Sequence, residues 1–397
     1  METPEIKKTS YRRLPLLIGA VSACCLVAAV AFAAVGFAHR PIKLAAVPPA
    51  NLPAPAPVAK TTPHLPLPGE VRGIYLTAST ASTFKNFVAI MNAVKTKGAN
   101  AVVLDVKADS GALAFEPSSP ALKGEAPVKK LIPDLDRVVA AVHGDGLYLI
   151  ARYPVFEDPA FAEKNPAIAL HVGSGGLWHD AKGLAWLDPA AEAAWKYNAD
   201  IARELYARGF DEVQLDYVRF ATDGSTSKIV YPVYDPKREK LRGTIGRFFA
   251  YMDKELRGAG IPISVDVFGF TTWHQTDLGI GQWYADALSH FDFVSPMVYP
   301  SHYPAGTLGF KNPAAQPYAI VADSLKKGNQ VVAQLANDPA HPKIGAQRPW
   351  LQAFNLGAVY TPAMITAQIK AARDAGSSGF LLWNAANKYA ELPDLRP

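Results

Sequence analysis

The chain has 397 residues, of which 49% are hydrophobic and 19% charged, as in an ordinary globular protein with a large core. Its net charge of +5 is small for this length, and no basic run carries interleaved aromatic residues, which argues against a nucleic-acid partner. The two cysteines, Cys24 and Cys25, are adjacent, and the nine histidines lack the spacing of a zinc site. The composition therefore predicts no disulfide, thiol chemistry, metal or other cofactor in the globular part.

The N-terminal segment predicts a membrane anchor. Residues 1–13 form a basic tail, and residues 14–38 form an almost uninterrupted apolar run, long enough to cross a hydrocarbon core of about 30 Å. The basic tail favours a cytoplasmic N-terminus, so we expect a single-pass protein of a bacterial inner membrane with its remainder outside the cytoplasm. Two alternatives stay open: a signal peptide cleaved near Ala33, and a lipoprotein signal ending at Cys24, against which the continuing apolar run argues.

Residues 39–69 are rich in proline and alanine and have little apolar surface to bury. This composition is typical of an extended, semi-rigid spacer. We expect the spacer to hold a domain over residues 70–397 away from the membrane.

From residue 71 the pattern alternates between strands and helices. Strands are predicted at 71–77, 101–107, 147–153, 210–220, 262–269, 293–299, 346–354 and 379–384. Helices are predicted at 83–97, 134–143, 188–208, 237–257, 314–327 and 362–375. Eight strands alternating with helices predict an α/β fold, either a (β/α)8 TIM barrel or a large doubly wound sheet. No glycine-rich phosphate loop follows the first strand, which excludes the nucleotide-binding sheets and favours the barrel.

Polar residues gather where the predicted strands end. They are Asp105, Lys107, Arg152, Asp216, Asp266, Tyr299 and Asn384. In a (β/α)8 barrel the C-terminal ends of the strands form the catalytic face. We therefore expect an active site among these side chains.

Two aspartates are the candidate catalytic residues. Asp216 alternates with the apolar residues of the fourth strand, and Asp266 with those of the fifth, so both should point into the barrel. Adjacent strands would bring their carboxyl groups within the roughly 5–9.5 Å that glycosidases use. Arg219, Lys107 or Arg152 would keep Asp216 ionised as nucleophile or charge stabiliser, whereas apolar neighbours would raise the pKa of Asp266 and make it the proton donor.

Less specific interpretations of the same residues stay open. Either aspartate could be a barrel-interior carboxylate satisfied by Lys or Arg, without a catalytic role. Glu157, just past the third strand, is the alternative acid, or else a solvated loop residue. Asp105 is either paired with Lys107 or Arg152, or in contact with substrate.

Sugars are bound by aromatic faces and by fans of hydrogen bonds, and the predicted loops supply both. The candidate substrate-binding residues are Asp105, Lys107, Arg152, Glu157, Tyr217, Arg219, Trp273, His274, Tyr299, Trp350, Gln352, Trp383 and Asn384. Trp178 and Trp186 lie in the long irregular stretch 154–187, while Trp195 sits within an amphipathic helix and is predicted to be core.

Several stretches together resemble a family of bacterial glycoside-hydrolase-like proteins with a barrel of the alpha-amylase type. They are Gly73-Ile-Tyr-Leu-Thr77, Val103-Leu-Asp-Val-Lys107, Asp211-Glu-Val-Gln-Leu-Asp-Tyr-Val-Arg-Phe220, Arg348-Pro-Trp-Leu-Gln352 and Gly379-Phe-Leu-Leu-Trp-Asn384. The resemblance covers residues 69–390 and implies that Asp216 is the nucleophile. It also implies a glutamate as acid on the fifth strand, where this chain has Asp266, and a proline after Phe220, where it has Ala221.

Together these features predict a glycoside hydrolase that acts on an envelope or extracellular polysaccharide. A non-catalytic polysaccharide-binding or envelope-scaffold barrel is the main alternative. An esterase or deacetylase is a weaker one, because the chain has no Gly-x-Ser-x-Gly motif and no clustered histidines.

Overall fold

The structure is a computed structural model that describes residues 63–341 and 343–397. The basic tail, the apolar run 14–38 and most of the predicted spacer lie outside these residues, so the expected anchor is not tested. Within the two described ranges, no helix has both the length and the apolar character needed to cross a membrane.

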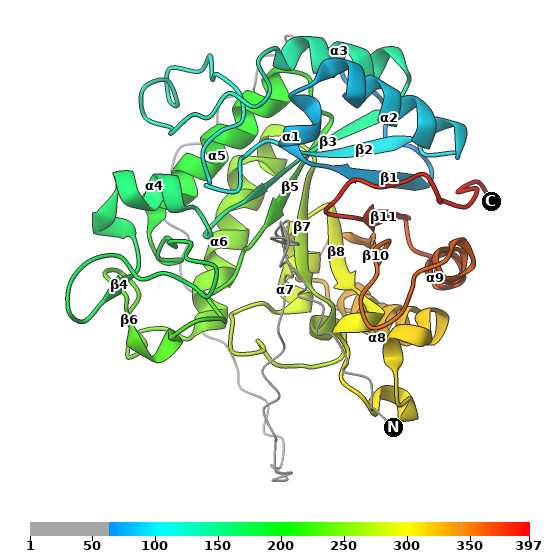
Figure 1. The fold of residues 1–397 in the computed structure, drawn as a ribbon. Coiled ribbons are helices and arrows are strands. Elements are labelled where there is room, and N and C mark those ends of the chain that lie inside the picture. Colours follow the sequence, from blue (N-terminus) through cyan, green and yellow to red (C-terminus); the bar gives the residue numbers. More distant parts are fainter. Residues whose placement is uncertain (1–62, 342) are drawn as a thin grey trace, which may run out of the picture. The chain divides into compact units, whose positions relative to one another are not determined.

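The described residues form a closed parallel barrel, as the alternation predicted (Figure 1). The strands that form it are β1 (Val71–Leu76), β2 (Ala101–Asp105), β3 (Tyr148–Pro154), β5 (Glu212–Asp216), β7 (Ile263–Phe268), β8 (Phe293–Val298), β9 (Ala346–Gln347), β10 (Trp350–Gln352) and β11 (Gly379–Trp383). Each pairs with the next in this order, except that β9 and β10 share the seventh place beside β8. Pairing of β11 with β1 closes the ring.

Helices surround the barrel. They are α1 (Ala78–Ala81), α2 (Phe84–Thr96), α3 (Leu135–Gly144), α4 (Pro159–Lys164), α5 (Glu192–Ala207), α6 (Leu241–Glu255), α7 (Tyr284–His290), α8 (Pro317–Ala336) and α9 (Pro362–Asp374). Some begin at side-chain caps, such as Asp134, which accepts the Arg137 N–H, and Thr361, which accepts the Met364 N–H. A two-stranded antiparallel pair, β4 (His171–Val172) and β6 (Ile229–Val230), joins two of the long loops.

Three differences from the predicted elements have local causes. Helix α8 runs to Ala336, beyond the predicted end at 327, because Leu335 continues its buried face. Helix α7 was not predicted, since its seven residues are too few to show a clear period. The seventh strand is interrupted between β9 and β10 by Pro349, which has no N–H to donate to a neighbouring strand.

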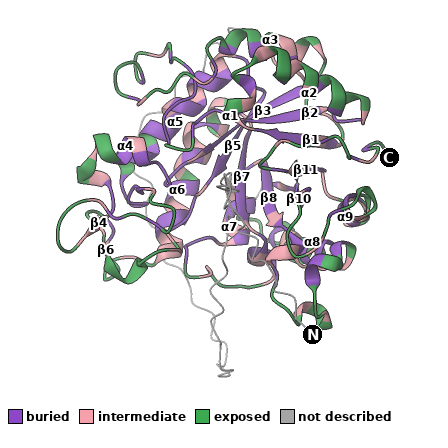
Figure 2. Ribbon diagram, in the orientation of Figure 1, coloured by how far each residue is buried: buried purple, intermediate pink, exposed green. Residues whose placement is uncertain are grey.

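Alternation along the strands separates two apolar cores. The larger lies between the strands and the helices, and the smaller fills the barrel with residues such as Val103, Ile150 and Leu381. The barrel strands are almost entirely buried, whereas the short strands β4 and β6 and the outer faces of the helices are exposed or half-buried (Figure 2). On β5 the inward positions are polar, which is costly unless each group finds a partner inside the barrel.

The lower inward residue of β5 is fully paired. Glu212 accepts hydrogen bonds from the Arg348 guanidinium and from Ser264 Oγ, and all three side chains are buried. One level higher, Gln214 Nε2 donates to Ser295 Oγ over 3.1 Å. The lower half of the barrel thus contains one matched ion pair, Glu212 with Arg348. The carboxylates in the upper half have to find their partners among the residues at the mouth.

Residues 63–69, expected to belong to the spacer, lie against the barrel domain. The His64 ring stacks on Tyr206 with ring centroids 4.0 Å apart, and the Leu65 N–H donates to Asp211 Oδ1 over 2.7 Å. Leu65 also packs against the inner core. Residues 64 and 65 therefore contact the domain that was predicted to begin at residue 70.

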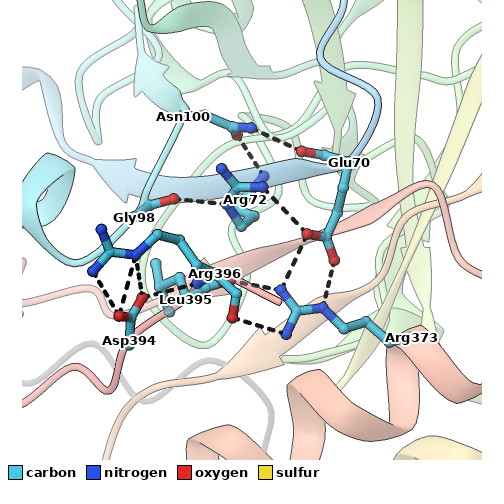
Figure 3. Close-up of polar contacts among 8 residues, drawn as sticks. All are labelled: Glu70, Arg72, Gly98, Asn100, Arg373, Asp394, Leu395 and Arg396. Atoms are coloured by element: carbon cyan, nitrogen blue, oxygen red, sulfur yellow. Dashed lines mark hydrogen bonds and ion pairs between the residues drawn. The ribbon is translucent and has the colours of Figure 1, made fainter.

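Polar contacts connect the start of β1, helix α9 and the C-terminal segment (Figure 3). Arg373 makes two hydrogen bonds to the Glu70 carboxylate and also donates to the carbonyls of Leu395 and Arg396. Arg72 donates to the Gly98 carbonyl and to Glu70. This cluster supports the β11–β1 seam where the barrel closes.

We predict that Arg373→Ala lowers the free energy of unfolding by about 1–2 kcal/mol, because the Glu70 carboxylate and two carbonyls lose a charged donor. The matched control is Lys370→Ala on the same helix, whose exposed pair with Asp374 should contribute little. Urea unfolding monitored by tryptophan fluorescence measures both. Equal losses in the two variants would contradict a supporting role for this cluster.

Candidate active site

Four adjacent strands bring one arginine and three aspartates together at the C-terminal end of the barrel. Asp105 ends β2, Arg152 lies near the end of β3, Asp216 ends β5, and Asp266 lies in β7. Asp105 and Arg152 are register partners, so they stand at the same level inside the barrel. The predicted convergence of the two catalytic candidates on one inner face is therefore present in the fold.

Arg152 is shared by all three carboxylates. Its Nη1 donates to Asp105 Oδ1 over 2.6 Å, its Nη2 donates to Asp216 Oδ2, and its Nε lies 3.4 Å from Asp266 Oδ2. Arg152 is only 6% exposed. One buried positive charge cannot neutralise three negative charges, so the cluster favours protonation of at least one aspartate.

Asp266 is the aspartate that this imbalance affects most. It is 1% exposed, and its Oδ1 accepts a 2.7 Å hydrogen bond from Trp350 Nε1. Burial raises its pKa well above the usual range, and the charge of Asp216 raises it further, against the opposing pull of Arg152. Asp266 is therefore the residue best placed to remain a neutral carboxylic acid.

Asp216 is in a different electrostatic environment. In addition to Arg152, its own neighbour donates to it: the Tyr217 N–H lies 2.6 Å from Asp216 Oδ1. Tyr217 has a φ of +52°, a left-handed backbone that a non-glycine residue adopts at a cost. Both contacts stabilise negative charge on Asp216, so the two candidate residues have opposite environments, as expected of an acid and a nucleophile.

Aromatic rings surround the carboxylates. Trp383 stacks on Tyr75 with centroids 4.0 Å apart, and its ring meets that of Trp350 edge to face at 5.4 Å. The Arg152 guanidinium lies 4.8 Å from the Trp383 ring centroid. Trp383 is only half-buried, so it presents aromatic surface next to the cluster.

A second aromatic group follows β8 and β10. The ring of Tyr299 is 5.3 Å from His302 and 5.6 Å from Phe354, measured between centroids. His302 and Phe354 are half-buried, and Phe354 packs against the inner core together with Trp383. The two aromatic groups therefore form part of one wall at the mouth of the barrel.

Lys107 lies away from the cluster. Its Nζ forms a buried ion pair with Asp158 Oδ2 at 2.7 Å and donates to the Pro154 carbonyl. The expectation that Lys107 could pair with Asp105 or Asp216 was wrong, and Arg152 makes both contacts instead. The cause is local: β2 ends at Asp105, and Lys107 already belongs to the loop that follows.

Gln352 and Asn384 bind backbone groups of the loops. Gln352 Nε2 donates to the Phe354 carbonyl over 3.0 Å, and its Oε1 accepts from the Ser301 N–H. Asn384 Nδ2 donates to the Ala353 carbonyl over 2.7 Å. These contacts shape the wall that carries the second aromatic group.

Trp273 and His274 lie in the loop after β7, at its contact with helix α8. Trp273 Nε1 donates to Ser324 Oγ, and Lys327 Nζ lies 3.8 Å from the centroid of its ring. His274 is exposed and stacks on Phe270. Both residues thus make their contacts with helix α8 and Phe270, away from the Arg152 cluster.

The rim beside Asp216 combines charged and aromatic groups. Glu157 is buried, which excludes the solvated-loop alternative, and its Oε2 lies 3.9 Å from Lys182 Nζ. Lys182 Nζ is also 3.5 Å from Tyr217 Oη. The Arg219 guanidinium covers the rings of Trp186 and Tyr217. Glu157 thus remains the alternative candidate for the acid, in addition to Asp266.

Tyr75 was not among the predicted site residues, although its hydroxyl donates to Asp105 Oδ2. The alternation of residues along β1 points its side chain into the barrel, and this pattern could have identified it. Trp178 and Trp186 are buried, with their indole N–H groups bonded to Ser225 and Asp180. Trp195 lies in the outer core, as predicted.

In the described part of the chain, no group of three or more His, Cys, Asp or Glu side chains is arranged to hold a metal ion.

Comparison with known structures supports the barrel. A hypothetical protein from Ruminiclostridium thermocellum ATCC 27405 is 30% identical, with a TM-score of 0.44 over 49% of this chain and 97% of that one. The PgaB (BpsB) glycoside hydrolase domain from Bordetella bronchiseptica is 14% identical, with a TM-score of 0.54 over 80% and 95%. An alpha-galactosidase from Thermus thermophilus is 13% identical, with a TM-score of 0.50 over 83% of this chain and 60% of that enzyme.

At 13–14% identity these last two likenesses concern the fold alone. No curated protein matched the sequence. A family model described as "Putative glycosyl hydrolase domain", however, matches residues 73–389, which is most of the chain and includes every strand of the barrel except the first two residues of β1. The chain belongs to this glycosyl hydrolase domain family.

Proposed function

We propose that the barrel hydrolyses glycosidic bonds by two-carboxylate catalysis at the Arg152 cluster. The observation that carries the proposal is the contrast between two neighbouring aspartates. Asp216 accepts hydrogen bonds from Arg152 and from a backbone N–H, whereas Asp266 is buried and its pKa is raised by that burial. Glycosidases need such a pair, one ionised and one protonated near neutral pH.

In the proposed reaction the charged carboxylate of Asp216 faces the anomeric carbon and stabilises the oxocarbenium-like transition state, or attacks it. Asp266 transfers its proton to the glycosidic oxygen, which then leaves as an alcohol. Water then attacks the anomeric carbon, forms the new C–O bond and gives its proton to the Asp266 carboxylate, which restores both aspartates to their starting states. Arg152 places its positive charge between the two aspartates, with Nη2 bonded to Asp216 and Nε beside Asp266.

We propose an envelope or extracellular polysaccharide as the substrate. Trp383 and Phe354 are only half-buried at the mouth, and the Trp383 ring lies beside Arg152, so their faces offer the stacking surfaces that sugar rings require. The apolar run 14–38 supports a location outside the cytoplasm with the barrel anchored at the membrane.

Asp216→Asn should lower the rate of hydrolysis by about 10³-fold or more while folding is retained. The neutral side-chain amide of asparagine can replace neither the negative charge nor the nucleophilic oxygen of the carboxylate. The measurement is release of reducing ends from a panel of purified bacterial envelope and extracellular polysaccharides. Asp374→Asn on the outer surface of α9 is the control and should keep full activity. Binding of a glycan without turnover by the unmodified protein would instead support the non-catalytic barrel.

A second prediction separates the two candidate acids. Asp266 is almost fully covered, and Glu157 at the rim is the alternative donor. Removing the true acid should slow cleavage of polysaccharide by about 10²–10⁴-fold. The loss should be much smaller for dinitrophenyl glycosides, whose leaving group needs no proton. We expect this pattern for Asp266→Asn and not for Glu157→Gln, and the reverse result would transfer the role to Glu157.

A third prediction tests the protonation of Asp266 without a substrate. Because its pKa is higher in the folded protein than in the unfolded chain, its contribution to stability is fully present at low pH and is lost as the pH rises from about 4. Asparagine mimics the neutral acid at every pH. The stability of Asp266→Asn relative to the unmodified protein should therefore increase from pH 4 to pH 7.

Urea midpoints across this range measure the effect. Asp374→Asn is the control and should show a nearly flat relative stability over this range, since contacts with Lys370 and Tyr318 lower the pKa of Asp374 and its contribution therefore changes mainly below about pH 4. A flat or falling relative stability for Asp266→Asn would show that Asp266 is ionised in the folded protein.

A further inference from the structure

Asp105 uses both of its carboxylate oxygens within the protein. Oδ1 accepts from Arg152 Nη1 over 2.6 Å, and Oδ2 accepts from the Tyr75 hydroxyl. Tyr75 is itself fixed by stacking on Trp383 and by an edge contact with Trp350. An aspartate held on two sides in this way is poorly placed to contact a sugar, which was one of the two roles expected for it.

The same contacts set the orientation of Arg152. The guanidinium is planar, so when Asp105 holds Nη1, the directions of Nη2 and Nε are set as well. These two groups face Asp216 and Asp266. Tyr75, Asp105 and Arg152 therefore form a line across β1, β2 and β3 that ends at the two candidate catalytic residues on β5 and β7.

We propose that Tyr75 and Asp105 are positioning residues for catalysis: together they hold Arg152 in the orientation that distinguishes Asp216 from Asp266. This inference rests on the proposed glycosidase function. It assigns a role to Tyr75 and gives the pairing of Asp105 with Arg152 a function in catalysis. Neither residue needs to touch the substrate.

Asp105 must be ionised to hold Arg152, and its surroundings decide when that happens. The groups that face it are Tyr75 from β1, Arg152 from β3, and the charges of Asp216 and Asp266 from β5 and β7. Burial raises the pKa of Asp105, while Arg152 and the Tyr75 hydroxyl oppose that rise. Loss of the hydroxyl should therefore let Asp105 take up a proton at a higher pH.

The test compares Tyr75→Phe with Tyr389→Phe. Tyr389 is a well-matched control, because it is also buried and its hydroxyl donates over 2.7 Å to the backbone carbonyl of Tyr75, not to a charged group. On a polysaccharide that the unmodified protein cleaves, Tyr75→Phe should lower kcat about tenfold and change KM by less than about twofold. It should also move the acid limb of the kcat/KM profile upward by roughly one pH unit. Tyr389→Phe should leave the position of that limb unchanged.

Asp105→Asn should cause a larger loss of kcat at every pH. Adding Tyr75→Phe to it should cost almost nothing more, since residues that act through one another are not additive. Additive losses would mean that Tyr75 acts independently of Asp105 and would overturn the proposal.

A second readout needs no turnover. Relative to the unmodified protein, the urea midpoint of Tyr75→Phe should fall progressively as the pH rises and Asp105 ionises, whereas the deficit of Tyr389→Phe should be the same at every pH. Parallel profiles for the two variants would overturn the inference. The two failures are distinguishable: full activity in Asp216→Asn rejects the proposed function, while an inactive Asp216→Asn with indistinguishable tyrosine variants rejects only the positioning role.

Discussion

The mouth of this barrel depends on a shortage of positive charge. Arg152 is the cation in contact with Asp105, Asp216 and Asp266, and all four groups are largely withdrawn from water. If the three carboxylates were ionised together, the repulsion and the desolvation would cost more than one guanidinium returns. The cluster is stable when one of the three carboxylates carries a proton. Asp266 is the most deeply buried of them, so it is the one that we expect to carry the proton.

The lower half of the same barrel makes the contrast clear. Glu212 and Arg348 are completely buried, yet their charges match one to one and Ser264 satisfies a remaining acceptor position. A purely structural ion pair has this form: one positive charge faces one negative charge, and both carboxylate oxygens of Glu212 accept hydrogen bonds. The upper cluster departs from it by two negative charges. Departures from electrostatic balance concentrate at functional sites, and here the departure lies at the face where barrels of this kind carry their chemistry.

Much of the fold could be predicted from the sequence because period-two alternation and helix boundaries are local signals. These signals predicted the strands of the barrel, the inward orientation of Asp216 and Asp266, and the burial of Trp195. The partners of the long polar side chains could not be predicted in the same way. Lys107 and Arg152 were equivalent candidates in the sequence, but two residues past the end of β2 the chain has turned, and Lys107 meets Asp158. Tyr75 was missed because a tyrosine on a buried strand is ordinary core material until its hydroxyl partner is known.

On the fifth strand this chain has Asp266 where the resemblance to amylase-type barrels implies a glutamate, and the shorter side chain has a structural consequence. Aspartate is shorter by one methylene, so from the same backbone position its carboxyl group stays deeper in the barrel, where Trp350 Nε1 binds it. The depth raises the pKa that a proton donor needs, but it also reduces access from the mouth to 1% exposure. A longer side chain would reach the substrate more easily and would be more hydrated, hence a stronger acid. The geometry of this chain therefore favours protonation over reach, and in the proposed reaction the glycosidic oxygen has to approach to the depth of the Trp350 indole to take the proton of Asp266.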